Sequence, residues 1–171
     1  GRVFRWVAAG GQRRGLDEHP GHQSAAQCED DSHGAALLER ERGGGSVAIV
    51  SWISGWKPGP GAQYGAAKAA EIFLASSLAW ELAPHGVRVN TVCPGSIMFD
   101  GGGWDRYQQS DPDGFAAFLK RDLPEGRLGT DQEVADVIAF VVSERARWVN
   151  GALIPVDGAQ GRPTARWFGD S

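Results

Sequence analysis

The segment AQYGAAKAAEIFLASSLAWELAPHGVRVNTVCPGSI, which runs from Ala62 to Ile97, decides the fold of this chain. Apolar and small residues dominate it as far as Leu82, and Pro84-His85-Gly86 then interrupts the pattern, which predicts one long helix. The run Val87 to Val92 follows and ends at Pro94-Gly95, which predicts a buried strand. A helix that leads directly into a buried strand is typical of an α/β protein with a parallel sheet.

Tyr64 and Lys68 stand four residues apart at the start of this helix, so they share one face about one turn from each other. An ammonium held near a phenol favours the phenolate and lowers the pKa of a tyrosine from about 10. Such a pair can serve as an acid/base group near neutral pH. The alternative interpretation is an ordinary helix start with a solvated lysine.

Four segments in sequence order resemble the short-chain dehydrogenase/reductase family. They are GGGSVAIVSWISG (Gly43 to Gly55), the segment quoted above, GRLGTDQEVADVIAFVVSE (Gly126 to Glu144) and VNGALIPVDGAQ (Val149 to Gln160). Together they resemble the C-terminal half of that family's single domain. The resemblance implies a partial Rossmann-like, doubly wound parallel sheet. It also implies reversible hydride transfer between NAD or NADP and an alcohol or carbonyl compound.

The same resemblance implies roles for individual residues. Tyr64 would exchange a proton with the substrate oxygen, and Lys68 would bind the cofactor ribose and modulate the tyrosine. Pro94, Gly95 and Ile97 would lie beside the nicotinamide. No metal site is expected.

The family's substrate-binding serine has two alignments in this chain. Counting from Gly55 in the pattern Ser-x-x-Gly, the favoured alignment, places Trp52 at that position, whereas counting from Tyr64 selects Ser51. Neighbouring side chains of a strand point to opposite faces. If Trp52 only fills a pocket, the hydroxyl comes from Ser51 or Ser54, and Ser51 is the candidate catalytic serine.

Residues 1–42 lack Ile, Thr, Lys and Tyr and sustain neither a helical nor a strand period, which predicts an irregular or disordered segment. Their glycines lie among polar residues, so no Gly-rich strand–turn–helix unit for a pyrophosphate is found before Gly43. The domain is expected over 43–161, with a tail over 162–171. The His and Cys residues of the first segment fit no standard metal site.

The chain begins with Gly1 rather than Met, which suggests a fragment or a mis-called reading frame. A one-base shift over His22 to Leu38 is codon-compatible with a family-like helix. Frame-shifted translation of a dehydrogenase gene and unrelated coil are the two interpretations of this segment.

The length of 171 residues, 42% hydrophobic content and 22% charged content are those of one globular domain. A net charge of -4 without a Lys/Arg cluster argues against nucleic acid as a partner. The absence of a run of ~20 apolar residues and of a signal peptide predicts no membrane association. Cys93, at the end of a buried strand pattern, is interpreted as a reduced core thiol of a cytoplasmic protein.

Ser96 to Glu125 is rich in Gly and aromatic residues and predicts a mobile lid with a short helix over a small apolar substrate. A surface excursion that packs its own aromatics is the alternative. Thr130 and Glu133 form a capping box that opens a helix to about Ser143, and Ala152 to Val156 is the last strand. We expect three or four strands and two main helices, with one sheet edge lacking neighbours.

Three function classes follow. The first is a dehydrogenase/reductase, truncated and impaired in this chain alone. The second is a catalytically silent remnant. The third is an interaction module whose long helix pairs with a second copy or with a dehydrogenase partner subunit.

Overall fold

The computed structural model describes residues 44–59 and 61–161. The predictions for the N-terminal segment, its shifted reading frame, its His and Cys residues and the C-terminal tail lie outside the described residues. Within the described part, strands β1 (Gly45–Val50), β2 (Val87–Pro94) and β5 (Leu153–Val156) form a parallel sheet in the order β1-β2-β5. The predicted α/β class with a parallel sheet is confirmed.

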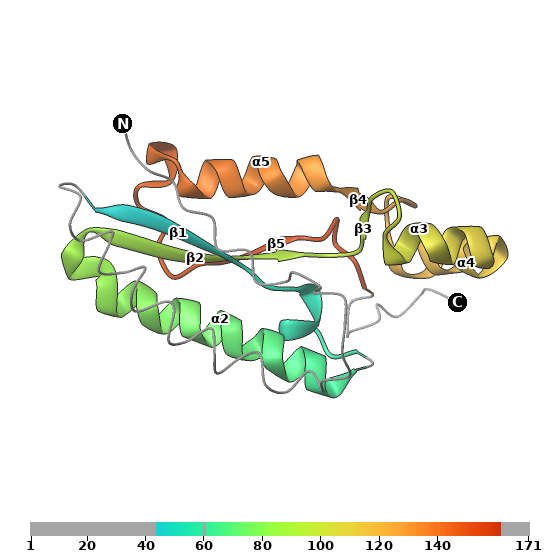
Figure 1. The fold of residues 1–171 in the computed structure, drawn as a ribbon, viewed down its shortest axis with the longest axis horizontal. Helices are drawn as coiled ribbons and strands as arrows, with labels where there is room; N and C mark the ends of the chain where they lie inside the picture. The colour runs from blue at the N-terminus through green and yellow to red at the C-terminus, as the bar shows by residue number, and fades with distance from the viewer. Residues whose placement is uncertain (1–43, 60, 162–171) are drawn as a thin grey trace, which may run out of the picture.

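One helix covers each face of this sheet. Figure 1 shows α2 (Ala62–Leu82) along one face and α5 (Asp131–Val142) along the other. The buried residues form a cluster on each side: Ile49, Ala75, Ala79, Val87 and Val89 on the α2 side, and Ala48, Val92, Ile97, Val134, Ile138 and Val141 on the α5 side. Residues next to each other in β1 therefore enter opposite clusters, as the alternation of a strand buried on both faces requires.

The helix α5 begins and ends with side-chain caps. The predicted capping box is confirmed, because the Thr130 hydroxyl accepts from the Glu133 N–H and the Glu133 carboxylate accepts from the Thr130 N–H. At the other end the guanidinium of Arg88, from β2, donates to the carbonyls of Val141 and Ser143. A cation at a helix C-terminus satisfies orphan carbonyls and complements the helix dipole.

The predicted helix Ala62 to Leu82 is confirmed over its full length, and a 3-10 turn, η2 (Ala83–His85), follows it. The strand predicted over Val87 to Val92 is longer than expected, because Cys93 and Pro94 pair with Pro155 and Val156 of β5. The longer β2 leads directly into the turn at Gly95, where the predicted cofactor-binding residues Pro94, Gly95 and Ile97 lie.

The segment predicted as a lid contains two helices rather than one. Strand β3 (Ile97–Met98) leads into α3 (Gly103–Ser110) and α4 (Pro112–Asp122), and β4 (Gly129–Thr130) returns to pair with β3. The aromatic residues pack against one another, with Trp104 stacked on Phe118 at 4.6 Å between ring centroids. They surround a small separate core of Phe115, Leu123 and Leu128. Figure 1 shows α3 and α4 beyond the end of the sheet at which the strands finish.

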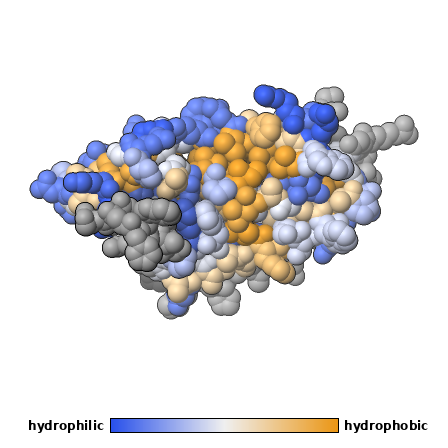
Figure 2. Space-filling view, turned by 180° about the vertical axis from the view of Figure 1, so that it is seen from behind, coloured by the Kyte–Doolittle hydropathy of each residue, from blue (hydrophilic) through white to orange (hydrophobic). Residues whose placement is uncertain are grey.

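The described residues form five strands, three in the main sheet and two in the β3–β4 ribbon, so the expected count of three or four was too low. Within the described part β1 pairs only with β2, as expected for a sheet edge without further neighbours. Figure 2 shows hydrophobic residues gathered in the middle of the opposite view, between the levels of α5 and α2. None of the helices in the described residues is both long enough and apolar enough to cross a bilayer.

Candidate active site at the end of the parallel sheet

Tyr64 and Lys68 lie on one face of the first turns of α2, as predicted from their spacing. The ammonium nitrogen of Lys68 is 5.7 Å from the centre of the Tyr64 ring. Tyr64 is 49% exposed, whereas Lys68 is 9% exposed. The phenol therefore faces solvent and is available to a ligand, with a largely buried cation one helical turn below it.

Lys68 has an acidic partner, Glu71, that was not predicted from the sequence. Its ammonium donates to both carboxylate oxygens of Glu71, at 2.9 and 3.0 Å. The side chains of the two residues are 11% and 18% exposed, so this ion pair is shielded from water. The i,i+3 spacing of Lys and Glu on a helix was the signal that could have revealed it.

The Ser51 side chain is hydrogen-bonded to the main chain of α2. Its hydroxyl donates to the main-chain carbonyl of Lys68 at 2.9 Å, and the residue is 3% exposed. Trp52 is the next residue along the chain and precedes the 3-10 turn η1 (Ile53–Gly55). The hydroxyl of Ser54, at the centre of this turn, is buried and has no hydrogen-bond partner among residues 44–59 and 61–161.

Gly55 explains why η1 sits so close to α2. A Cβ atom at this position would lie 2.8 Å from the main-chain carbon of Lys68 and 2.8 Å from Ile72 Cδ1. A glycine at position 55 therefore permits the close contact between η1 and α2. Gly55 is also the residue from which the alignment that places Trp52 at the serine position is counted.

Pro94, Gly95 and Ile97 come together in the turn that follows β2, and all are buried. The Gly95 N–H donates to the Val156 carbonyl at 3.0 Å. A Cβ atom at Gly95 would lie 2.7 Å from Gln160 Oε1 and 2.8 Å from Asp157, so this turn packs directly against the turn after β5. The three predicted nicotinamide neighbours therefore lie at the carboxyl ends of the parallel strands, the end of the sheet at which α2 begins.

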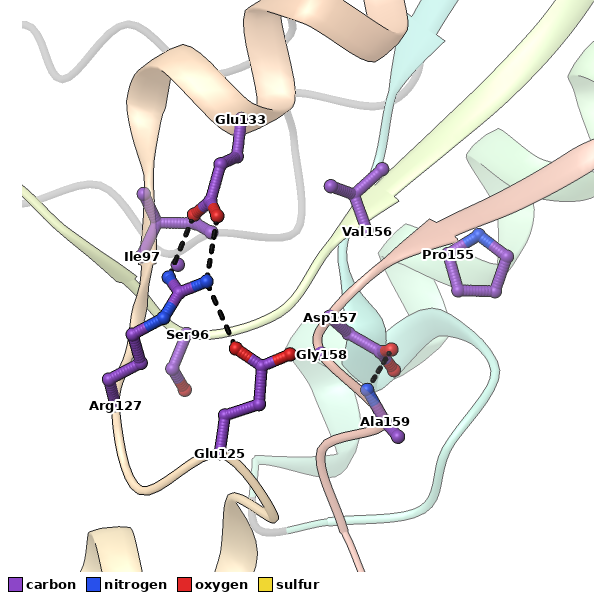
Figure 3. Close-up of a pocket in the computed structure, with 11 residues that line it drawn as sticks. Ser96, Ile97, Glu125, Arg127, Glu133, Pro155, Val156, Asp157, Gly158 and Ala159 are labelled. Carbon is purple, nitrogen blue, oxygen red and sulfur yellow. Dashed lines mark hydrogen bonds and ion pairs between the residues drawn. The ribbon is translucent and has the colours of Figure 1, made fainter.

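A cavity of about 320 Å³ opens beside this turn (Figure 3). Its lining comes from the turn after β2, the loop before α5 and the end of β5: Ser96, Ile97, Glu125, Arg127, Gly129, Glu133, Pro155, Val156, Asp157, Gly158 and Ala159. Figure 3 shows the Arg127 guanidinium between the carboxylates of Glu133 and Glu125, at 2.8 and 3.0 Å. The cavity shares Ile97 with the predicted cofactor residues, but Tyr64 and Lys68 are not among its lining residues.

Two ionisable groups near this end of the sheet have strongly shifted pKa values. The hydrogen bond from Arg127, together with those from Thr130, lowers the pKa of Glu133 to about 2. Burial raises the pKa of the Cys93 thiol to about 11. Cys93 is fully buried and forms no disulfide within the described residues, in agreement with the predicted core thiol.

The donor set at this edge fits the nicotinamide-ribose end of a dinucleotide. A half-exposed phenol and an ammonium lie one turn apart, and a glycine-containing turn lies at the ends of the neighbouring strands. Ligands of open α/β sheets bind at the carboxyl ends of the strands. This geometry suits a site where a hydroxyl or carbonyl group meets Tyr64.

Comparison with known proteins defines the class. The family model described as Enoyl-(Acyl carrier protein) reductase matches residues 32–159. The chain belongs to the short-chain dehydrogenase/reductase family of oxidoreductases.

Individual relatives agree with this assignment. The chain is 39% identical over 126 residues to the 3-oxoacyl-(acyl-carrier-protein) reductase MabA of Mycobacterium tuberculosis, covering 72% of this chain and 48% of the relative. It is 37% identical over 122 residues to an uncharacterized short-chain type dehydrogenase/reductase of Sinorhizobium fredii, covering 70% and 46%. A short-chain type dehydrogenase/reductase from Mycobacterium ulcerans has a similar structure, with a TM-score of 0.64 and 31% identity over 75% of this chain and 45% of that one. The chain spans about half of the length of these relatives.

Proposed function

We propose that this chain carries the proton-transfer half of an NAD- or NADP-dependent oxidoreductase that interconverts an alcohol and a carbonyl compound. The observation that carries the proposal is the exposed Tyr64 phenol held one turn above the buried Lys68 ammonium, at the carboxyl end of a parallel sheet. Bound NAD(P) would accept or supply the hydride.

Each candidate site residue has a defined part in this proposal. The Tyr64 hydroxyl donates a proton to the substrate oxygen in reduction and accepts it in oxidation. The Lys68 ammonium binds the ribose and stabilises negative charge on the phenol. Pro94, Gly95 and Ile97 form the wall against which the nicotinamide rests. α3 and α4 cover the substrate, whose apolar part meets their aromatic residues.

Two features support low activity for this chain by itself. Residues 1–42 of the sequence contain no Gly-rich fingerprint of the kind that holds a pyrophosphate in dinucleotide-binding folds. The Ser51 hydroxyl already donates a hydrogen bond to the Lys68 carbonyl, and Trp52 occupies the neighbouring position. We therefore propose weak dinucleotide binding and little turnover in this chain alone. A catalytically silent remnant is the limiting case.

The test is a titration of NADH and NADPH fluorescence, followed by a screen of small alcohols and ketones. Wild type, Tyr64→Phe and Trp52→Ser are compared, with circular dichroism to establish that each is folded. We expect binding weaker than micromolar and no gain of turnover in Trp52→Ser. Trp52→Ser should gain turnover only when a complementary family N-terminal half is also supplied in trans, and then only when Tyr64 is intact. Failure of Tyr64→Phe to abolish that restored turnover would refute the proposed role.

The outer face of α2 favours a second function, pairing with another copy or with a related subunit. Phe73 and Trp80 lie seven residues apart on this helix and are 75% and 85% exposed. Exposed Ala66, Ala69 and Ala70 continue the same face toward Tyr64. Large exposed aromatic side chains beside small residues permit close contact between two helices.

A further inference from the structure

Gln160, just before the end of the described chain, connects three segments that surround the candidate active site. Its side-chain oxygen accepts from the Ser96 N–H at 2.7 Å, and its side-chain nitrogen donates to the Ser96 hydroxyl at 2.8 Å. Ser96 is 5% exposed and lies between Gly95 and Ile97. The Gln160 side chain therefore bonds to both the N–H and the hydroxyl of Ser96, a buried residue in the turn after β2.

Lys57 holds the backbone around Gln160 from the other side. The Lys57 ammonium donates to the Asp157 carboxylate at 2.8 Å and also to the Gln160 carbonyl. The Asp157 side chain is only 8% exposed, so this ion pair is shielded on the acidic side. Lys57 stands in the loop between η1 and α2, seven residues before Tyr64.

The turn that carries Gln160 is tightly determined. Ala159 has a φ of 59°, a left-handed conformation that residues other than glycine seldom adopt. The Asp157 carboxylate accepts from the Ala159 N–H at 3.1 Å, and the Asp157 carbonyl accepts from the Gln160 N–H at 2.9 Å. Strained conformations persist where surrounding contacts over-determine them, and they cluster at functional sites.

We propose that Gln160, held by Lys57 and Asp157, is a positioning residue that sets the turn Pro94–Ile97 against the loop leading to Tyr64. Lys57, Ser96, Asp157 and Gln160 form the Gln160 clamp. It fixes the wall of the nicotinamide site relative to the helix that carries the acid/base pair. The catalytic meaning of the clamp rests on the proposed function, whereas its effect on the turn does not.

The clamp also reaches the lid. The N–H of Gly161, the next residue, donates to the carbonyl of Asp122 at the end of α4 at 2.8 Å. Loss of the Gln160 side chain should therefore free the turn after β2 while leaving β1 and the body of β2 in place. Both of those strands are held by their own ladder.

Gln160→Met keeps the shape of the side chain and removes both hydrogen bonds to Ser96. Gln160→Glu keeps two acceptors, for the Ser96 N–H and for the Ser96 hydroxyl acting as donor. The control is Gln132→Met, because Gln132 is an exposed residue of α5 whose side-chain nitrogen donates to the Asp136 carboxylate, away from the Gln160 clamp. Residue-resolved amide hydrogen exchange of the whole chain is the measurement.

In Gln160→Met we expect the Ser96 amide to exchange roughly tenfold faster, the order of magnitude for losing one buried hydrogen bond. Gln160→Glu should stay close to wild type, and Gln132→Met should match wild type. Lys57→Met should accelerate Ser96 less than Gln160→Met, because the side-chain pair with Ser96 remains. An unchanged Ser96 amide in Gln160→Met overturns the proposal, as does equal acceleration at Val89 and Val92, which would mean general loosening.

A parallel titration of the same variants with NADH and NADPH separates the clamp from the proposed function. If wild type binds, Gln160→Met should bind about tenfold more weakly and Gln160→Glu should recover. Wild-type binding that stays unchanged in Gln160→Met overturns the positioning role. If no variant binds measurably, the result agrees with the weak binding proposed for this chain alone, and the exchange of the Ser96 amide decides the clamp.

Discussion

Individual residues at the end of the sheet fall into two groups, those visible in the local sequence and those defined only by long-range contact. Tyr64 and Lys68 were predicted from their spacing, and the helix places them on one face. Gln160 was not, because its partner Ser96 lies 64 residues away in the chain. A local sequence period cannot reveal a contact of that range, so the Tyr64–Lys68 pair could be predicted from the sequence but the contact between Gln160 and Ser96 could not.

Gly55 offers a direct test of the packing of η1 on α2. Gly55→Ala should destabilise the chain by about 1–3 kcal/mol, the usual cost of overpacking, because the added methyl meets the Lys68 backbone. Gly59→Ala is the matched control, since nothing lies within 4 Å of a Cβ at that position. Urea unfolding measures both. Equal midpoints for the two variants would contradict the close contact.

Glu133 predicts a pH dependence of stability. Its pKa is lowered to about 2 in the folded chain from an ordinary value of 4.5. A carboxyl group with a lowered folded pKa stabilises the fold above its unfolded pKa and loses that contribution as the pH falls toward the folded value. The stability difference between wild type and Glu133→Gln should therefore be constant above pH 4.5 and shrink between pH 4.5 and 2.

Thermal unfolding of wild type and Glu133→Gln across this pH range is the measurement. Because the side chain is exposed, the effect should be small and should weaken with added salt. Glu81→Gln, an exposed substitution on α2, is the control. A difference that grows with falling pH would show that the Arg127 pair does not stabilise the fold.

At the scale of elements, the sequence predicted the order and nature of the main helices and strands because each has its own period and its own end signals. Ala62 to Leu82 has such signals, and so has the capping box at Thr130. The ends of strands were less well predicted. β2 continues through Pro94 because β5 pairs with it there, and that neighbour arrives from a distant part of the chain. The division of the segment Ser96 to Glu125 into α3 and α4 was not predicted, although Asp111 and Pro112 are a cap and a first-turn proline.

Arg88 ties β2 to the end of α5 and is the element-scale test. Arg88→Met keeps the apolar stem but leaves the carbonyls of Val141, Ser143 and Val149 without this donor. We expect a loss of about 1–3 kcal/mol in the free energy of unfolding. Burial lowers the pKa of the Arg88 guanidinium from its ordinary value. Exposed Arg147→Met, compared by urea unfolding, should change little, and an equal loss in both variants would argue against the cap.

At the scale of the whole molecule, the described part is a thin sheet with one helix on each face and unequal protection of the two helices. Three residues of α5 are buried in the core, whereas α2 contributes only Ala75 and Ala79 to it, although α2 has 21 residues and α5 has 12. A longer helix with no larger buried face leaves more surface uncovered. The sequence predicted this helix to be apolar on most sides, and Phe73 and Trp80 are the residues left outward.

This uncovered face predicts self-association through α2. Wild type should show a concentration-dependent rise in molar mass by light scattering coupled to size-exclusion chromatography. The double substitution Phe73→Ser and Trp80→Ser should reduce it, since burial of two aromatic side chains favours association by several kcal/mol. Trp148→Ser is the matched control, because Trp148 is 96% exposed but lies in the loop after η3 (Glu144–Ala146) rather than on α2. A monomer with a sharp, cooperative unfolding transition at all concentrations would contradict the prediction. Loss of association in Trp148→Ser alone would instead place the contact on the loop after η3 rather than on the outer face of α2.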